Sequence, residues 1–213
     1  FFDDDADGAV LKWDVEGQAV STLVAAPSPP GALQVSADGL TLQVSPGMHR
    51  IMRVDNQQWL HEHGMRASYL SPDGRLVLKE SGEGVLRIHE LSTRKEWSVM
   101  AGRHNSLTHA RFSPDGRLLL LVNKAAGVDL VDVASGRLLR QLLPRSTPGI
   151  PIPAFTSDGL SIVVVLSGAN TVSRWACHEC QSAEQLMEDA KRRIASTMSN
   201  EERLSAGLPP VPN

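Results

Sequence analysis

A four-residue turn signature recurs along this chain and constrains its fold more than any other feature. The signature reads Ser or Thr, any residue, Asp, Gly, and it begins at residues 36, 71, 113 and 156, so the intervals are 35, 42 and 43 residues. Its Gly tolerates the positive φ that a tight hairpin demands, and a proline at the second position presets φ there. A period near ~40 residues indicates a repeat architecture in which each unit is one supersecondary element.

The stretch from residue 104 to residue 142 shows the repeating unit most clearly. Its four short apolar runs are separated by turn signals and cover Leu107–Phe112, Arg117–Asn123, Val128–Val133 and Arg137–Leu142. Runs this short, bounded by Gly, Asp and Ser, favour strands over helices. Each repeat is therefore predicted to be a four-stranded antiparallel meander, and four strands in each unit of ~40 residues are typical of a β-propeller.

Two segments resemble the WD40 family. The segment HNSLTHARFSPDG, from His104 to Gly116, resembles the opening of a WD40 repeat, and DGAVLKWD, from Asp7 to Asp14, resembles its third strand. The resemblance covers about residues 1–177 and implies propeller blades. It also implies that Asp7, Trp13 and His104 belong to the structural hydrogen-bond network of such blades. Since no repeat keeps the whole set, degenerate blades are expected.

We expect an all-β, WD40-like partial propeller of about four to five four-stranded blades over residues 1–177, followed by a short C-terminal helical extension over residues 178–213. The first repeat is expected to hold only a third and a fourth strand, near Val10–Val15 and Gln18–Leu23. The last repeat has no fourth strand. This asymmetry predicts a truncated piece of a longer ring, with the missing blades upstream or supplied in trans.

Strands in the other repeats follow from the same signals. They are predicted near Ala32–Val35, Leu40–Val44, Arg50–Val54, Gln58–His63, Ala67–Leu70, Leu76–Glu80, Val85–Leu91, Glu96–Met100, Ile152–Phe155, Leu160–Leu166 and Thr171–Cys177. Beyond them, Ser182 and Ser199 each begin a capping-box pattern, with Gln or Glu three residues later, and these patterns predict two helix starts.

Composition excludes several classes of protein. The net charge is −3 and the pI is near 6.2, which argues against a nucleic-acid binder with a basic stripe. No apolar run reaches the ~18 residues of a membrane-spanning helix. Two cysteines are too few for a disulfide framework, so two free thiols in a reducing, cytoplasmic compartment are expected.

An acidic run near the N-terminus is a candidate calcium loop. Asp3, Asp5, Asp7 and Asp14 fit a D-x-D-x-D-G pattern with a carboxylate at the twelfth position, and alternating oxygen ligands of this kind can wrap a hard cation. An EF-hand needs helices on both sides, whereas Val10–Val15 has the pattern of a strand. The alternative is an acidic turn between two strands.

A second candidate metal site lies at the junction with the C-terminal segment. Cys177 and Cys180 form a C-x-x-C motif, and two thiolates at this spacing can bind zinc, although a structural site needs two further ligands. A redox motif of the thioredoxin kind would need a βαβ context. The remaining interpretation is a junction that carries two thiols.

The resemblance implies a non-catalytic scaffold or sensor module, because propellers offer rigid faces of loops that hold partners. The chain looks like the C-terminal part of a bacterial multidomain signalling or defence protein, with protein partners or upstream domains of the same parent chain and with no cofactor, nucleic acid or membrane. Two alternatives stay open. One is a fragment of a lactonase-like or quinoprotein-like propeller enzyme, and the other is a fragment that completes its ring by self-assembly.

Overall fold

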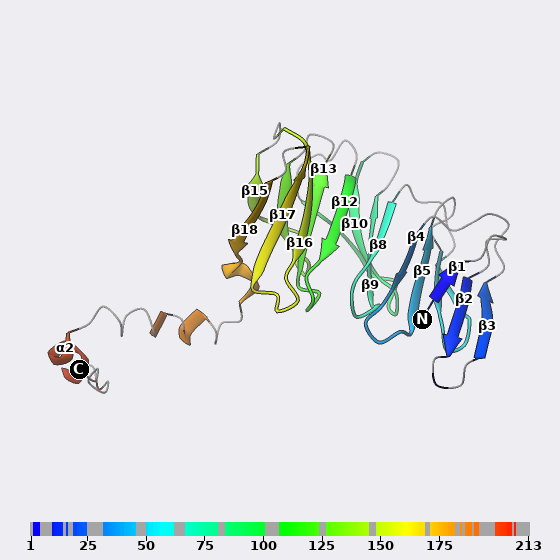
Figure 1. Ribbon diagram of the computed structural model, residues 1–213, viewed down its shortest axis with the longest axis horizontal. Coiled ribbons are helices and arrows are strands. Elements are labelled where there is room, and N and C mark those ends of the chain that lie inside the picture. Colours follow the sequence, from blue (N-terminus) through cyan, green and yellow to red (C-terminus); the bar gives the residue numbers. More distant parts are fainter. Residues whose placement is uncertain are drawn as a thin grey trace.

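Five antiparallel sheets follow one another along the chain and stand side by side in an arc (Figure 1). The computed structural model describes residues 2–4, 10–14, 16, 19–24, 32–45, 50–61, 67–80, 84–100, 107–123, 127–144, 148–168, 171–181, 184, 186–188, 190–191, 199–205 and 207. Every sheet is built from consecutive strands. We call the sheets blades 1 to 5 in chain order.

The strands have the following bounds. Blade 1 contains β1 (Phe2–Asp4), β2 (Val10–Asp14) and β3 (Ala19–Val24). Blade 2 contains β4 (Ala32–Val35), β5 (Thr41–Ser45), β6 (Arg50–Arg53) and β7 (Trp59–His61). Blade 3 contains β8 (Ala67–Leu70), β9 (Leu76–Glu80), β10 (Leu86–Glu90) and β11 (Glu96–Ser98). Blade 4 contains β12 (Leu107–Phe112), β13 (Leu118–Asn123), β14 (Val128–Asp132) and β15 (Leu138–Leu143). Blade 5 contains β16 (Ile150–Phe155), β17 (Ser161–Ser167) and β18 (Thr171–Ala176).

The all-β prediction is confirmed, with four strands in blades 2 to 4 and three in blade 5. Blade 1 holds one strand more than predicted, because Phe2–Asp4 pairs with β2 through Asp3↔Leu11 and Asp4↔Val10. Two aspartates in three residues give this segment a poor intrinsic strand preference. Its strand conformation comes from pairing with β2. Local propensity does not predict such a pairing.

The recurring signature forms the same hydrogen-bonded turn between the first and second strands of blades 2 to 5. In blade 4 the Ser113 hydroxyl donates to Asp115 Oδ1 over 2.6 Å and accepts the Leu118 N–H at 2.9 Å. Asp115 Oδ1 also accepts the Arg117 N–H, at 3.1 Å. Equivalent bonds form around Ser36, Ser71 and Thr156. All of them lie within six consecutive residues, so sequence alone specifies this turn.

Replacing Ser113 with alanine is expected to destabilise the chain by about 1–3 kcal/mol, the cost of leaving a buried N–H without a partner. The side chain is only 2% exposed, so water does not readily replace its hydroxyl at the Leu118 N–H. The matched control is Ser135→Ala, because Ser135 hydrogen-bonds Asp132 in an exposed turn. Thermal unfolding followed by circular dichroism measures both variants, and equal melting temperatures would contradict this account.

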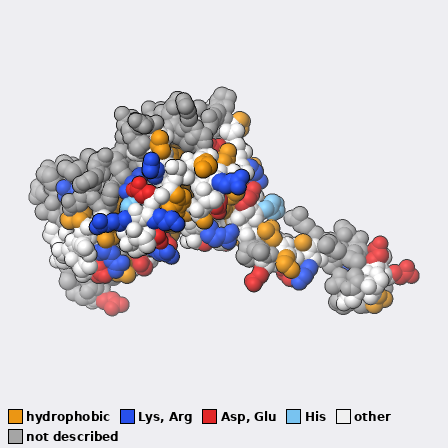
Figure 2. Space-filling view, turned by 180° about the vertical axis from the view of Figure 1, so that it is seen from behind, with side chains coloured by type: hydrophobic (Ala, Val, Ile, Leu, Met, Phe, Trp, Pro, Cys, Tyr) orange, Lys and Arg blue, Asp and Glu red, His pale blue; other side chains and the backbone are white. Residues whose placement is uncertain are grey.

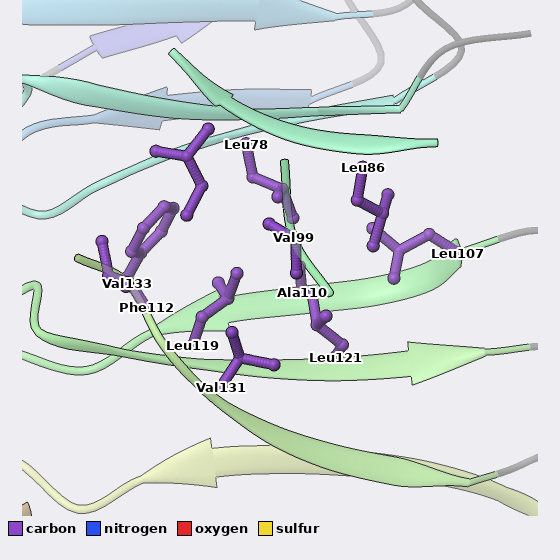
Figure 3. Close-up of a cluster of buried hydrophobic side chains, with 11 residues drawn as sticks. Leu78, Leu86, Val99, Leu107, Ala110, Phe112, Leu119, Leu121, Val131 and Val133 are labelled. Atoms are coloured by element: carbon purple, nitrogen blue, oxygen red, sulfur yellow. The ribbon is translucent and has the colours of Figure 1, made fainter. Parts of the chain in front are cut away.

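Among the described residues, buried hydrophobic side chains form four clusters, one between each pair of neighbouring blades. Blades 3 and 4 share the largest, in which Leu78 and Leu86 meet Phe112, Leu119 and Leu121 (Figure 3). Alternate residues of β13 face opposite neighbours, since Leu119 and Leu121 pack toward blade 3 while Leu118, Leu120 and Val122 pack toward blade 5. Because β13 is buried on both faces, its sequence is a continuous apolar run.

Two glutamine side chains join blades 2 and 3, whose shared cluster is the smallest, with three buried residues. The Gln34 amide donates to the Leu70 carbonyl over 2.7 Å and accepts the Leu70 N–H at 3.1 Å. Gln43 Nε2 donates to the Ser68 carbonyl over 2.8 Å. These amides satisfy backbone groups of β8 that blade 2 would otherwise bury without partners.

The C-terminal part contributes a short 3-10 helix, η1 (His178–Cys180), and a helix, α2 (Asn200–Ser205). The capping box predicted at Ser199 is confirmed, because Ser199 and Glu202 exchange side-chain and backbone hydrogen bonds. The box predicted at Ser182 and Gln185 lies outside the described residues. None of the described helices is long and apolar enough to cross a membrane.

Candidate functional site

In blades 2 to 5, the turn that follows the third strand begins with the same backbone hydrogen bond. In blades 2 to 5 the N–H groups of Val54, Leu91, Val133 and Cys177 donate, each over 2.9 Å, to the carbonyls of Leu40, Arg75, Arg117 and Leu160. Three blades therefore place an aliphatic side chain at a position where blade 5 places a cysteine. Counted from the turn signature, the donor lies 18, 20, 20 and 21 residues downstream, a regularity that sequence could have revealed.

Cys177 and Cys180 are joined by a disulfide, with their Cα atoms 5.2 Å apart. The expectation of two free thiols is therefore wrong for the form seen here. Three-residue spacing brings the sulfurs together because η1 folds the chain back, with the Cys180 N–H donating to the Cys177 carbonyl over 3.2 Å. In this form neither sulfur is the thiolate that zinc requires. The zinc interpretation therefore concerns only a reduced state.

The two sulfur-bearing residues differ in their surroundings. Cys177 is 2% exposed and belongs to the apolar cluster between blades 4 and 5. Cys180 packs against the same cluster but is only partly buried, and it lines a small pocket of about 220 Å³ between the turn signatures of these two blades. The other lining residues are Ser113, Pro114, Asp115, Arg117, Asp158, Gly159 and Leu160.

Charged groups surround the pocket. A hydrogen bond from the Thr156 hydroxyl, with a second from the Leu160 N–H, lowers the pKa of Asp158, which is therefore ionised at neutral pH. Arg117 Nε lies 3.8 Å from Asp115 Oδ2. The lining thus carries two carboxylates and one guanidinium. Arg140 of β15 pairs with Glu179 at 3.4 Å and so ties η1 to blade 4.

The calcium candidates fall partly outside the described residues. Asp3 lies in β1 and Asp14 in β2, so strands flank the loop, whereas Asp5 and Asp7 are not among the residues that the structure describes. No group of three or more metal-binding side chains gathers in the described part of the chain. Of the residues predicted to form a WD40 network, Trp13 lies in β2, and Asp7 and His104 lie outside the described residues.

The second candidate site is the face of blade 5 that points away from blade 4. Ile152, Val165 and Val172 are direct neighbours across β16, β17 and β18, and they are 47%, 40% and 68% exposed. We call these three residues the open row. The alternate residues on the opposite face, among them Ile162 and Val164, are buried against blade 4. Sequence reasoning predicted these strands but not which face of the sheet stays exposed.

Elsewhere on the surface, opposite charges lie close together. Seen from behind, Lys and Arg side chains lie beside acidic and hydrophobic ones (Figure 2). Three pairs are Arg53 with Asp55, Arg75 with Glu90, and Lys79 with Glu96. Charges of both signs are therefore interspersed on the surface.

Comparison with solved structures identifies the architecture. The β-propeller domain of Cps50 (Swd1) from Myceliophteria thermophila superposes with a TM-score of 0.67 at 14% identity, over 86% of this chain and 63% of that domain. The chain folds as a partial β-propeller. Hydrazine synthase from Kuenenia stuttgartiensis matches with a TM-score of 0.55 at 22% identity, over 74% of this chain and 49% of that protein.

At these identities the likeness shows the fold alone. No family model matches the sequence. The partial propeller spans about 63% of the Cps50 domain. The open row thus lies on the face of blade 5 whose equivalent in blades 1 to 4 packs against the next blade.

Proposed function

We propose that this partial propeller is a non-catalytic protein-binding scaffold and that the open row of blade 5 is its contact surface. The observation that supports the proposal is a continuous row of exposed apolar side chains on a rigid, hydrogen-bonded sheet. Contiguous exposed apolar patches mark sites of interaction, among them protein contact sites. In the wider proposal, the scaffold serves a cytoplasmic bacterial signalling or defence protein.

The interface between blades 4 and 5 indicates what the open row would bind. Counted from their turn signatures, Leu120 and Val122 of blade 4 correspond to Val163 and Val165 of blade 5. Val128 pairs with Val122 as Val172 pairs with Val165, so these two residues also correspond. The blade 4 residues are fully buried by the sheet of blade 5. The open row therefore has the chemistry of a surface that another blade covers, and covering each exposed side chain would contribute on the order of 1 kcal/mol.

For the isolated chain, the occupant that we propose is a second copy. Within the described residues, β18 pairs only with β17, whereas β6, β10 and β14 each pair with an outer strand. An unpaired strand beside an apolar row favours association with another sheet. Blade 1 offers such a sheet, since it packs against blade 2 through Val10 and Leu23 while Val20 is 47% exposed. Contact between blade 5 and blade 1 of a second copy would extend the arc in trans.

The solution mass of the purified chain tests this proposal. We expect light scattering to give a mass that rises with concentration above 23.0 kDa, and we expect Val165→Lys to return it to the monomer because a charge on the open row cannot be buried unpaired. The matched control is Leu139→Lys, since Leu139 is 46% exposed but lies on β15. A wild-type chain that stays monomeric at ~100 μM, a concentration at which even weak contacts of μM affinity would be populated, would overturn the proposal.

A further inference from the structure

The disulfide of blade 5 stands where blade 4 has an ordinary turn, and its two cysteines are buried to different extents. The equivalent turn of blade 4 runs from Val133 to Gly136 and contains no cysteine. Cys177 occupies, in the cluster between blades 4 and 5, the position that Val133 occupies in the cluster between blades 3 and 4. Cys180 borders the pocket between the two turn signatures. A molecule in the pocket would therefore meet Cys180 first.

We propose that the Cys177–Cys180 disulfide is a thiol–disulfide exchange site, at which a small thiol enters the pocket and attacks Cys180 Sγ. The pocket volume of about 220 Å³ suits a molecule of a few heavy atoms. Burial of Cys177 directs the attack to Cys180, because an incoming thiolate must reach the sulfur with which it forms the new bond. This inference stands independently of the proposed scaffold function.

The exchange takes two balanced steps. The incoming thiolate forms a bond to Cys180 Sγ, the Sγ–Sγ bond breaks, and its electron pair leaves on Cys177 Sγ, which then takes a proton from water. A second small thiol, as thiolate, then attacks the small-molecule sulfur of this mixed disulfide. The attack forms the small-molecule disulfide, and Cys180 leaves as a thiolate. In sum, two small thiols are oxidised and one protein disulfide is reduced.

Blade 5 is expected to stay folded through this change. The Cys177 N–H keeps its bond to the Leu160 carbonyl, and a free cysteine remains compatible with an apolar cluster. The covalent restraint is lost only across η1, which the pair between Arg140 and Glu179 continues to hold. The exchange would therefore act on the turn that leads out of the propeller rather than on the blade.

The pocket charges predict which thiols react fastest. Among the lining residues two carboxylates outnumber one guanidinium, while Arg174, whose charge also acts on Asp158, does not line the pocket. A cationic thiol should therefore accumulate near Cys180 and an anionic thiol should be repelled. At a distance of ~6 Å in water, one unit of charge changes the local concentration by about threefold. Cysteamine is therefore expected to react faster than 3-mercaptopropionate, an anionic thiol of similar size, at equal thiolate concentration, and Asp158→Asn should narrow the difference between the two rates.

Mass spectrometry of the folded chain provides the test. Treatment with cysteamine, followed by acid quenching and peptide mapping, should show an adduct on Cys180 and none on Cys177. The variant Cys177→Ala should form a lasting Cys180 adduct when treated with cystamine, the disulfide form of this thiol. In Cys180→Ala the remaining thiol should react at least ~10-fold more slowly, because it is buried.

Circular dichroism during the reaction separates exchange in the folded chain from exchange after unfolding. The expected result is reduction with the β-sheet spectrum unchanged. Adducts on Cys177, or reduction only under denaturing conditions, would overturn the proposal and leave a purely structural disulfide. Repeating the reaction with the Val165→Lys variant, which is expected to be monomeric, shows whether the exchange depends on the oligomeric state.

Discussion

Gly136→Ala is expected to destabilise the chain by about 2–5 kcal/mol, from left-handed strain and overpacking together. Gly136 has a φ of +68°, and a Cβ added there would lie 2.2 Å from the Ser98 carbonyl oxygen. That oxygen cannot move aside easily, because Ser98 of β11 is paired with Arg87 of β10. The Met100 N–H also donates to the Gly136 carbonyl over 2.6 Å, so any shift breaks a bond between blades 3 and 4.

The matched control for this effect is Gly116→Ala. Gly116 has a φ of +72°, but nothing lies within 4 Å of the Cβ that alanine would add. This variant should therefore show only the left-handed cost of about 1–2 kcal/mol. Urea unfolding measures the difference in stability between the two variants. Equal midpoints would show that the close approach to Ser98 does not contribute to the destabilisation.

The second large effect is expected for Leu120→Ala. Leu120 is fully buried between blades 4 and 5, and truncating a buried leucine costs about 2–5 kcal/mol. Because each blade contacts only its neighbours, stability in such an arc is nearly a sum of local terms. Hydrogen exchange should therefore show lost amide protection in β16, β17 and β18, with β8, β9 and β10 little changed.

Leu139→Ala serves as the control for the buried leucine. Leu139 is 46% exposed on β15, and surface substitutions of this kind usually change stability by less than about 0.5 kcal/mol. If Leu120→Ala destabilised blades 3 and 5 equally, the arc would unfold as one cooperative unit, and the local picture of blade-by-blade packing would be wrong.

The disulfide also bears on where the protein works. Disulfides persist in oxidising compartments, whereas in the cytosol they are usually transient. The cytoplasmic location in our proposal therefore requires that the Cys177–Cys180 bond be reversible. The exchange experiment consequently tests both the chemistry of Cys180 and the consistency of that location.

Sequence by itself determined the turns and, through them, the repeat. Every bond of the turn at Ser113 lies within six residues, so the local pattern carries all the necessary information. The strand β13 was equally predictable, because five consecutive apolar residues beside a tight turn fit a strand buried on both faces. Even the box between Ser199 and Glu202 follows from local spacing.

Tertiary structure alone decided which partners those strands would meet. The Gln34 amide bonds a backbone 36 residues away, β1 is a strand only because β2 pairs with it, and Val165 is exposed while Val164 beside it is buried. Both valines have the same intrinsic preferences, so their difference arises from the neighbouring blade. The disulfide belongs to this group too, since the blade fold, rather than the C-x-x-C spacing, buried Cys177 and left Cys180 at a pocket.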